Sequence, residues 1–393
     1  MKTKFLLLFL LGLLELNAQT YSYMRQWKIS DTTYNALFGN GLALDSSNNV
    51  YAINFADDRI RKFDAAGNFI MQWGKYGTGN GQFYFPSGLN ITSSGNIYVV
   101  DESNARIQEF DLNATYITQW GSWGIGNSKF KSPTGIAINN TSGDVYVAEL
   151  VNNRVQKFSS SGTYISQWGT AGSGNGQFNM PNGMAIDKVG NVYVVDAGNS
   201  RIQKFNANGT FVSKWGSNGT GNGQFKSPAG IAIDTAGNIY VTEGGNYRIQ
   251  KFSSSGTFVT KWGSKGTGDG QFNYGPSGIA VDKAGNVYVG SWGDNRIQVF
   301  SPDIQTATEP LSKPTSEVLV YPNPFTGETS LLFHESLNNT TVNIIDITGR
   351  QMRSIVFSGK QTVIEQGDLQ SGIYFLNVML NNQIINTQKI VIQ

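Results

Sequence analysis

A repeat of 47 or 48 residues constrains this chain more than any other feature. Six copies of one pattern follow one another, and the copy PAGIAIDTAGNIYVTEGGNYRIQKF at 228–252 shows it in full. The same arginine recurs in every copy, at Arg59, Arg106, Arg154, Arg201, Arg248 and Arg296. A fixed period of this length indicates stacked supersecondary units that bury their apolar faces against one another.

Each copy predicts four short β-strands. In the 228–252 copy, the runs GIAI and IYVTE flank a turn at 234–238, where Gly and Asn accept positive φ angles. The second run is apolar on both sides, so both faces of its sheet must be covered. RIQKF is the third strand, and a fourth ends in Trp-Gly at Trp73, Trp120, Trp168, Trp215 and Trp262. Four-stranded blades stacked around an axis meet these requirements, so we expect an all-β chain that forms a six-bladed β-propeller.

The sixth copy ends at Phe300 without a Trp-bearing strand of its own. A matching segment lies at the other end of the chain, where YSYMRQW at 21–27 resembles TYITQW at 115–120. Trp27 precedes Trp73 by 46 residues, close to one repeat length. We therefore predict that the N-terminal segment pairs with the strand Arg296–Phe300 and closes the ring, which leaves no exposed blade faces.

The pattern PxGIAxDxxGNxYVxDxxNxRIQ resembles the NHL repeat family. The resemblance covers residues 20–302 and implies a six-bladed propeller, which we place at 19–302. It does not fix a function, because members of the family include RNA binders, enzymes and interaction platforms.

Export is predicted from the N-terminus. Residues 1–18 have the pattern of a signal peptide, in which Lys2 and Lys4 precede a ten-residue apolar run that is far shorter than the ~20 residues of a membrane span. We expect no transmembrane segment. The chain has no cysteine, which excludes disulfides and thiol catalysis, and its formal net charge is only +2. This charge and the exported destination argue against a nucleic-acid partner.

Residues 303–316 predict a linker, and residues 317–393 predict a small antiparallel β-sandwich. This C-terminal unit resembles the sorting domain of the type IX secretion system in YPNPF at 321–325, DITGR at 346–350, LQSGIYFL at 369–376 and the closing KIVIQ. The resemblance implies that the secretion machinery recognises 317–393 and that the protein crosses the periplasm to the surface or exterior of a Gram-negative bacterium. The motif residues are Tyr321, Pro322, Asn323, Pro324, Gly372, Tyr374 and Lys389. An ordinary accessory sandwich is the alternative.

An acidic residue precedes the repeat arginine by five positions in four copies, which suggests ion pairs across one hairpin. The pairs are Asp101–Arg106, Glu149–Arg154, Asp196–Arg201 and Glu243–Arg248. We expect them to be structural, since a ligand is rarely six-fold symmetric, and to be worth only ~0–1 kcal/mol each if exposed. A ring of charge around the channel mouth is the functional alternative.

Copies six and one depart from this pattern, with Ser291 and Asn54 in place of the acid. We therefore expect a neutral, aromatic arc across the ring closure, where the arginines are available to a partner. Its candidate ligand-binding residues are Phe55, Arg59, Trp292 and Arg296, together with Tyr76 and Trp123 from loops between blades. Packing between loops is the alternative role for these side chains.

Catalysis has little support in the sequence. The single histidine, His334, lies in the C-terminal unit, which excludes a Ser-His-Asp triad or a multi-histidine zinc site in the propeller. We expect no cofactor and no metal. A calcium-dependent hydrolase or lactonase that uses channel carboxylates is the alternative, although Asp45, Asp187, Asp234 and Asp282 stand where an Asp commonly caps a turn. The leading hypothesis is a secreted or surface-displayed binding propeller whose partner is an extracellular polysaccharide or protein.

Overall fold

The computed structural model describes residues 20–393 except 30–40, 292, 304–317, 348–349 and 381–382. The predicted signal peptide, nearly all of the predicted linker and Trp292 lie outside the described residues. The chain divides into two compact units, Met1–Ile304 and Gln305–Gln393. No helix among the described residues is long and apolar enough to cross a membrane.

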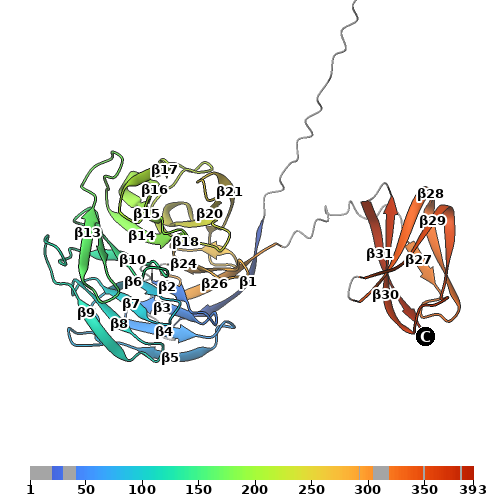
Figure 1. The fold of residues 1–393 in the computed structure, drawn as a ribbon, viewed down its shortest axis with the longest axis horizontal. Coiled ribbons are helices and arrows are strands. Elements are labelled where there is room, and N and C mark those ends of the chain that lie inside the picture. The colour runs from blue at the N-terminus through green and yellow to red at the C-terminus, as the bar shows by residue number, and fades with distance from the viewer. Residues whose placement is uncertain (1–19, 30–40, 292, 304–317, 348–349, 381–382) are drawn as a thin grey trace, which may run out of the picture. The chain divides into compact units, whose positions relative to one another are not determined.

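The first unit is a ring of six four-stranded antiparallel sheets, which confirms the predicted propeller (Figure 1). Blade one contains β2 (Leu42–Leu44), β3 (Val50–Asn54), β4 (Arg59–Phe63) and β5 (Phe69–Trp73). Blade two contains β6 (Pro86–Ile91), β7 (Ile97–Asp101), β8 (Arg106–Phe110) and β9 (Tyr116–Trp120). Blade three contains β10 (Pro133–Ile138), β11 (Val145–Glu149), β12 (Arg154–Phe158) and β13 (Tyr164–Trp168).

The remaining blades repeat this arrangement. Blade four contains β14 (Pro181–Ile186), β15 (Val192–Asp196), β16 (Arg201–Phe205) and β17 (Phe211–Trp215), with the 3-10 helix η1 (Ala197–Asn199). Blade five contains β18 (Pro228–Ile233), β19 (Ile239–Glu243), β20 (Arg248–Phe252) and β21 (Phe258–Trp262), with η2 (Gly244–Asn246). A short parallel pair, β22 (Ser264–Lys265) and β23 (Gln271–Phe272), leads into blade six.

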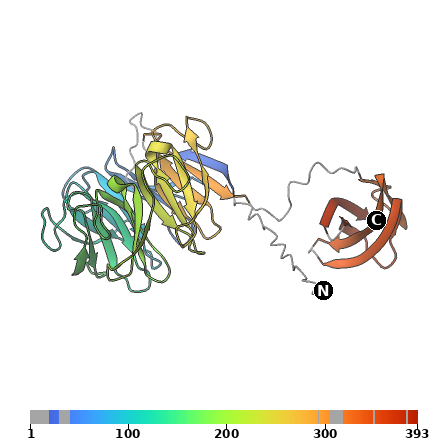
Figure 2. The same ribbon diagram turned by 90° about the horizontal axis from the view of Figure 1, so that it is seen from above.

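Blade six is completed by the N-terminus, as predicted. It contains β24 (Pro276–Val281), β25 (Val287–Ser291) and β26 (Arg296–Pro302), with β1 (Tyr21–Lys28) as its outer strand. Trp27 lies opposite Ile297, the same register that places Trp120 opposite Ile107 in blade two. Figure 2 shows the blue β1 beside the orange β26 at this closure.

The repeated sequence explains how the blades pack. The second strands are buried along their whole length, as the apolar runs predicted. Each outer-strand tryptophan packs between neighbouring blades. The Trp168 ring centroid, for example, lies 6.0 Å from that of Tyr146 in its own blade and 5.7 Å from that of Phe205 in the next. Gly230 on an innermost strand leaves room for the adjacent blade, because a Cβ there would come within 2.1 Å of the Ser277 carbonyl oxygen.

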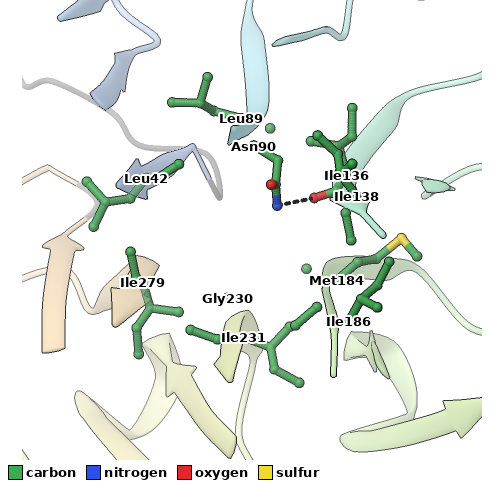
Figure 3. Close-up of a pocket in the computed structure, with 18 of the residues that line it drawn as sticks. Leu42, Leu89, Asn90, Ile136, Ile138, Met184, Ile186, Gly230, Ile231 and Ile279 are labelled. Carbon is green, nitrogen blue, oxygen red and sulfur yellow. Dashed lines mark hydrogen bonds between the residues drawn. The ribbon is translucent and has the colours of Figure 1, made fainter. Parts of the chain in front are cut away.

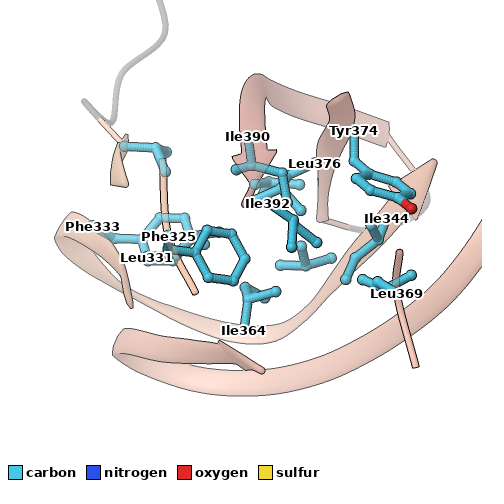
Figure 4. Packing of buried hydrophobic residues seen from close by; sticks show 13 residues of the cluster. Phe325, Leu331, Phe333, Ile344, Ile364, Leu369, Tyr374, Leu376, Ile390 and Ile392 are labelled. Atoms are coloured by element: carbon cyan, nitrogen blue, oxygen red, sulfur yellow. The ribbon is translucent and has the colours of Figure 1, made fainter. Parts of the chain in front are cut away.

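The second unit is a five-stranded antiparallel sheet of β27 (Val318–Tyr321), β28 (Glu328–Asp346), β29 (Gln351–Glu365), β30 (Gly372–Leu380) and β31 (Gln383–Ile392). The long β28 pairs with β27 near its start and with β30 near its end. The sheet therefore folds over one apolar core, which is the sandwich-like unit expected (Figure 4).

Candidate functional site

The propeller has two faces with different chemistry. Since strands alternate in direction within a blade, the loops between second and third strands lie on the same face as the connections from one blade to the next. We call this the loop face. The turns between first and second strands and between third and fourth strands make the opposite face, which we call the turn face.

The acid–arginine pairs lie inside the loop face rather than on it. Asp101 is fully buried, and its Oδ2 accepts a hydrogen bond from Arg106 Nε at 2.7 Å. The pairs Glu149–Arg154, Asp196–Arg201 and Glu243–Arg248 are buried in the same way. The small energy expected for an exposed pair therefore does not apply, because breaking a buried pair leaves an uncompensated buried charge.

These pairs hold the glycine-rich connections between blades. Arg106 donates to the carbonyl oxygens of Thr78, Gly79 and Gln82 at 2.7 to 2.9 Å. Asp101 accepts the N–H of Tyr84 at 2.8 Å. Each connection is thereby tied to the following blade, a role that the positions of these residues in the sequence do not reveal.

Blades six and one keep a carboxylate, but at a different position. Asp294 Oδ2 accepts the backbone N–H of Asn273 at 3.0 Å, as Asp101 does from Tyr84 in blade two. In blade one Asp57 pairs with Arg61 at 2.6 Å. The expectation of a neutral arc across the closure is therefore wrong. Blade two has an acid at Asp101 followed three residues later by Asn104, whereas blade one has the reverse order, with Asn54 followed by Asp57.

The two arginines predicted to be available differ from each other. Arg296 donates to Gln26 Oε1 at 2.8 Å and to the carbonyl oxygens of Thr267 and Gln271 at 2.9 and 2.8 Å, so it serves its connecting loop as Arg106 does. Its predicted availability to a partner is wrong. Arg59 is half-buried beside Asp57; burial raises the pKa of Asp57, and Arg61 and Arg59 oppose that rise.

Aromatic side chains gather on the loop face at the junction of blades one and two. Phe55 stacks on Phe85 with ring centroids 4.5 Å apart, and Phe85 stacks on Tyr84 at 4.8 Å. Tyr76 meets Tyr84 edge-on at 5.2 Å and is 67% exposed. The sequence pointed to Phe55 and Tyr76 but not to Tyr84 and Phe85. These two residues could have been found by comparing the repeats, since the other junctions have Lys-Ser, Asn-Met or Asn-Tyr at the same two positions.

Trp123 takes the position of Tyr76 in the next connecting loop and is 72% exposed. The Lys131 ammonium lies 4.9 Å from the centroid of its ring. We define the aromatic arc as Phe55, Tyr76, Tyr84, Phe85 and Trp123. It runs along the junctions of blades one, two and three, whereas Arg296 belongs to another junction.

The central channel is lined by the innermost strands and has a volume of about 300 Å³ (Figure 3). Among its described lining residues, only Asn90 and Asn140 have polar side chains. The aspartates at the turns between first and second strands cap those turns, as their positions in the sequence indicate. Asp234, for example, accepts N–H groups of Ala236 and Asn238 and the hydroxyl of Tyr240.

The described residues contain no group of three or more His, Cys, Asp or Glu side chains that could hold a metal ion. The channel therefore offers no described carboxylate cluster for the chemistry of a calcium-dependent hydrolase.

The YPNPF segment of the sorting motif lies against the closing strand β31, whereas Gly372 and Tyr374 belong to the interior strand β30. The Asn323 side chain donates to the Lys389 carbonyl oxygen at 2.7 Å and accepts the Val391 N–H at 2.8 Å, so the YPNPF segment is fixed against the closing strand. Tyr321, Pro322 and Pro324 are exposed. Tyr374 is buried, with its hydroxyl donating to the Gln370 carbonyl oxygen at 2.9 Å, and Gly372 begins its strand.

Comparison with protein families agrees with both units. The NHL repeat model matches residues 83–110, 130–158, 178–205, 225–252 and 273–300. The model described as a secretion system C-terminal sorting domain matches residues 319–393. No curated protein matches the chain.

Solved structures with the same fold are distant in sequence. A Bacteroides thetaiotaomicron protein of unknown function is 18% identical, with 72% of this chain and 76% of that one covered and a TM-score of 0.56. A gluconolactonase from Xanthomonas campestris is 13% identical, with 71% and 89% covered and a TM-score of 0.52. At these identities the likeness shows the propeller fold alone.

The fold and the family matches together define an NHL-repeat β-propeller, in which five of the six blades match the family model. The C-terminal unit is a type IX sorting domain, so the protein is secreted to the cell surface or the extracellular space and engages the secretion machinery.

Proposed function

We propose that this protein is a secreted, non-catalytic binding propeller that takes an extracellular polysaccharide on the aromatic arc of its loop face. The observation that carries the proposal is the run of contacting rings from Phe55 through Phe85 and Tyr84 to Tyr76. The most exposed rings of the arc are those of Tyr76 and Trp123. Exposed aromatic rings stack on sugars and lose little conformational freedom when they do so.

The stability of the loops supports this function. The buried arginines fix each connecting loop through its backbone carbonyls, so the rings that the loops carry are held in place before a ligand arrives. Such preorganisation reduces the ordering cost of binding. The alternative is that the same arc binds a protein partner, and the experiment below distinguishes this from polysaccharide binding.

The proposal is tested with the full mature protein on an array of glycans and outer-surface proteins. For a polysaccharide that binds the protein on the array, Tyr76→Ala and Trp123→Ala should each weaken binding by about tenfold or more, as loss of an aromatic hot-spot residue does. Phe69→Ala is the matched control, since this ring is 57% exposed at the opposite end of β5. Equal losses in all three variants, or retention of proteins but not glycans, would contradict the proposal.

A further inference from the structure

The connecting loop between blades two and three departs from the other loops at several positions. The common sequence GTGNGQF becomes GIGNSKF at 124–130, preceded by Trp123. Ile125 is 70% exposed where other loops have Thr or Ser. The backbone nevertheless follows the same path. The Gly124 N–H donates a hydrogen bond to the Phe130 carbonyl oxygen at 3.0 Å, just as the Gly77 N–H donates to the Phe83 carbonyl oxygen in the preceding loop.

Two of these departures weaken the loop. Ser128 has a φ of 58° where Gly81, Gly176, Gly223 and Gly270 have φ of 71° to 76°. A non-glycine residue is disfavoured in this left-handed region. Lys129 replaces a glutamine whose Oε1 accepts the N–H of Gly79, Gly174, Gly221 or Gly268 in the other loops. Lysine has no acceptor, so this bond cannot form here.

Positive charge surrounds an exposed indole here, and the departure at Lys129 adds to it. Lys129 is exposed, Lys131 lies over the Trp123 ring, and Lys75 is exposed beside Tyr76 in the neighbouring loop. Among the described residues, no carboxylate lies within salt-bridge distance of these three lysines.

The acid of blade three that contacts this loop is buried and engaged. Glu149 is fully buried against Arg154 and accepts the Lys131 N–H at 3.0 Å. Turn-face lysines contrast with this arrangement, because Lys157 and Lys204 pair with Asp144 and Asp187.

From these observations we propose that the loop at 123–131 binds the acidic sugars of an anionic polysaccharide, with a sugar ring on Trp123 and its carboxylate or sulfate group at Lys129 and Lys131. This inference rests on the proposed function and names its ligand class. Ammonium groups without carboxylate partners attract anions, and an exposed indole offers a stacking face. Residues that lower the stability of a loop but supply ligand-binding groups, as Ser128 and Lys129 do here, are expected at functional sites.

The test uses the full mature protein and two forms of one polymer, polygalacturonate and its methyl ester, with alginate and dextran sulfate as further acidic probes. Polygalacturonate should bind at least about tenfold more tightly than the ester. Added salt should weaken polygalacturonate binding, because salt screens the attraction between lysine and carboxylate charges. Equal binding of the ester, or no binding to any acidic probe, overturns the inference. Trp123-dependent binding of the neutral ester would do so while leaving the proposed function intact.

The decisive variant restores the common loop sequence, Ser128→Gly with Lys129→Gln. It should raise the unfolding temperature and weaken polygalacturonate binding by about fivefold or more, so loss of binding cannot be attributed to misfolding. Lys188→Gln, an exposed lysine on the turn face, is the charge-matched control for Lys129→Gln and should leave binding unchanged. Unchanged affinity in the restored loop overturns the inference. So does equal affinity for a single-stranded DNA oligonucleotide, which would show that charge alone is recognised.

Discussion

Tyr21 stacks on Trp262 with ring centroids 4.3 Å apart and planes inclined by 13°. Its hydroxyl lies 2.8 Å from that of Tyr240. At four of the other junctions a turn glycine lies against the tryptophan, as Gly209 does against Trp168. Blade six has no turn between third and fourth strands, because β1 supplies its fourth strand, so Tyr21 takes this place. Ring closure thus includes a contact with blade five as well as strand pairing.

Tyr21→Ala should lower the free energy of unfolding by about 2–4 kcal/mol, because a large stacked ring leaves a packed site at the closure. Urea denaturation of the mature protein measures this loss. Met24→Ala on the same strand removes a half-exposed side chain and should cost less than about 0.5 kcal/mol. Similar losses in the two variants would contradict the role of Tyr21.

Trp168→Ala should destabilise the propeller by about 3–5 kcal/mol, since its ring fills the space between blades three and four. Trp123→Ala is the comparison within the same chain. Its ring is mostly exposed, so its loss should cost less than about 1 kcal/mol. Denaturation curves that give both variants the same stability would refute this assignment.

Arg201→Ala should cost about 3–5 kcal/mol, because it leaves Asp196 buried without its charge partner and frees the carbonyl oxygens of Ser173, Gly174 and Gln177. Lys214→Ala, which removes an exposed cation from the outer strand of the same blade, should change stability by less than about 0.5 kcal/mol. An Arg201→Ala loss under about 1 kcal/mol would mean that the network is not a structural support.

The sequence predicted the ring well because its determinants are local and periodic. The apolar second strands and the Trp27 spacing fix the blades and the closing strand. The burial of Asp101 and Arg106 was missed because their partners Tyr84 and Gln82 lie in the preceding loop, 17 and 24 residues earlier. The pattern within one hairpin carries no information on these partners.

The aromatic arc was only partly predictable for a related reason. Comparison of copies identifies unusual residues such as Trp123, but not which of them touch. The shift of the acid from position 54 to Asp57, and from 291 to Asp294, was visible in the sequence. The position five residues before the repeat arginine does not reveal this shift by itself, because the acid moves three residues along the loop.

Removal of Gln305–Gln393 should leave a folded propeller that accumulates in the periplasm, because the sorting domain is a separate compact unit. Cell fractionation with a propeller-specific antibody measures its distribution, and the intact chain is the control. Normal amounts of the truncated protein at the cell surface or in the medium would show that export does not depend on this domain.

Hydroxyl-radical footprinting of the mature protein with saturating polygalacturonate distinguishes ligand binding on the loop face at blades one to three from binding elsewhere. We expect reduced labelling of Tyr76, Tyr84 and Trp123, with Phe69 and Val189 on the turn-face side unchanged. Protection of Val189 and Phe69, or of the channel residue Met184, with Trp123 fully reactive would contradict this expectation.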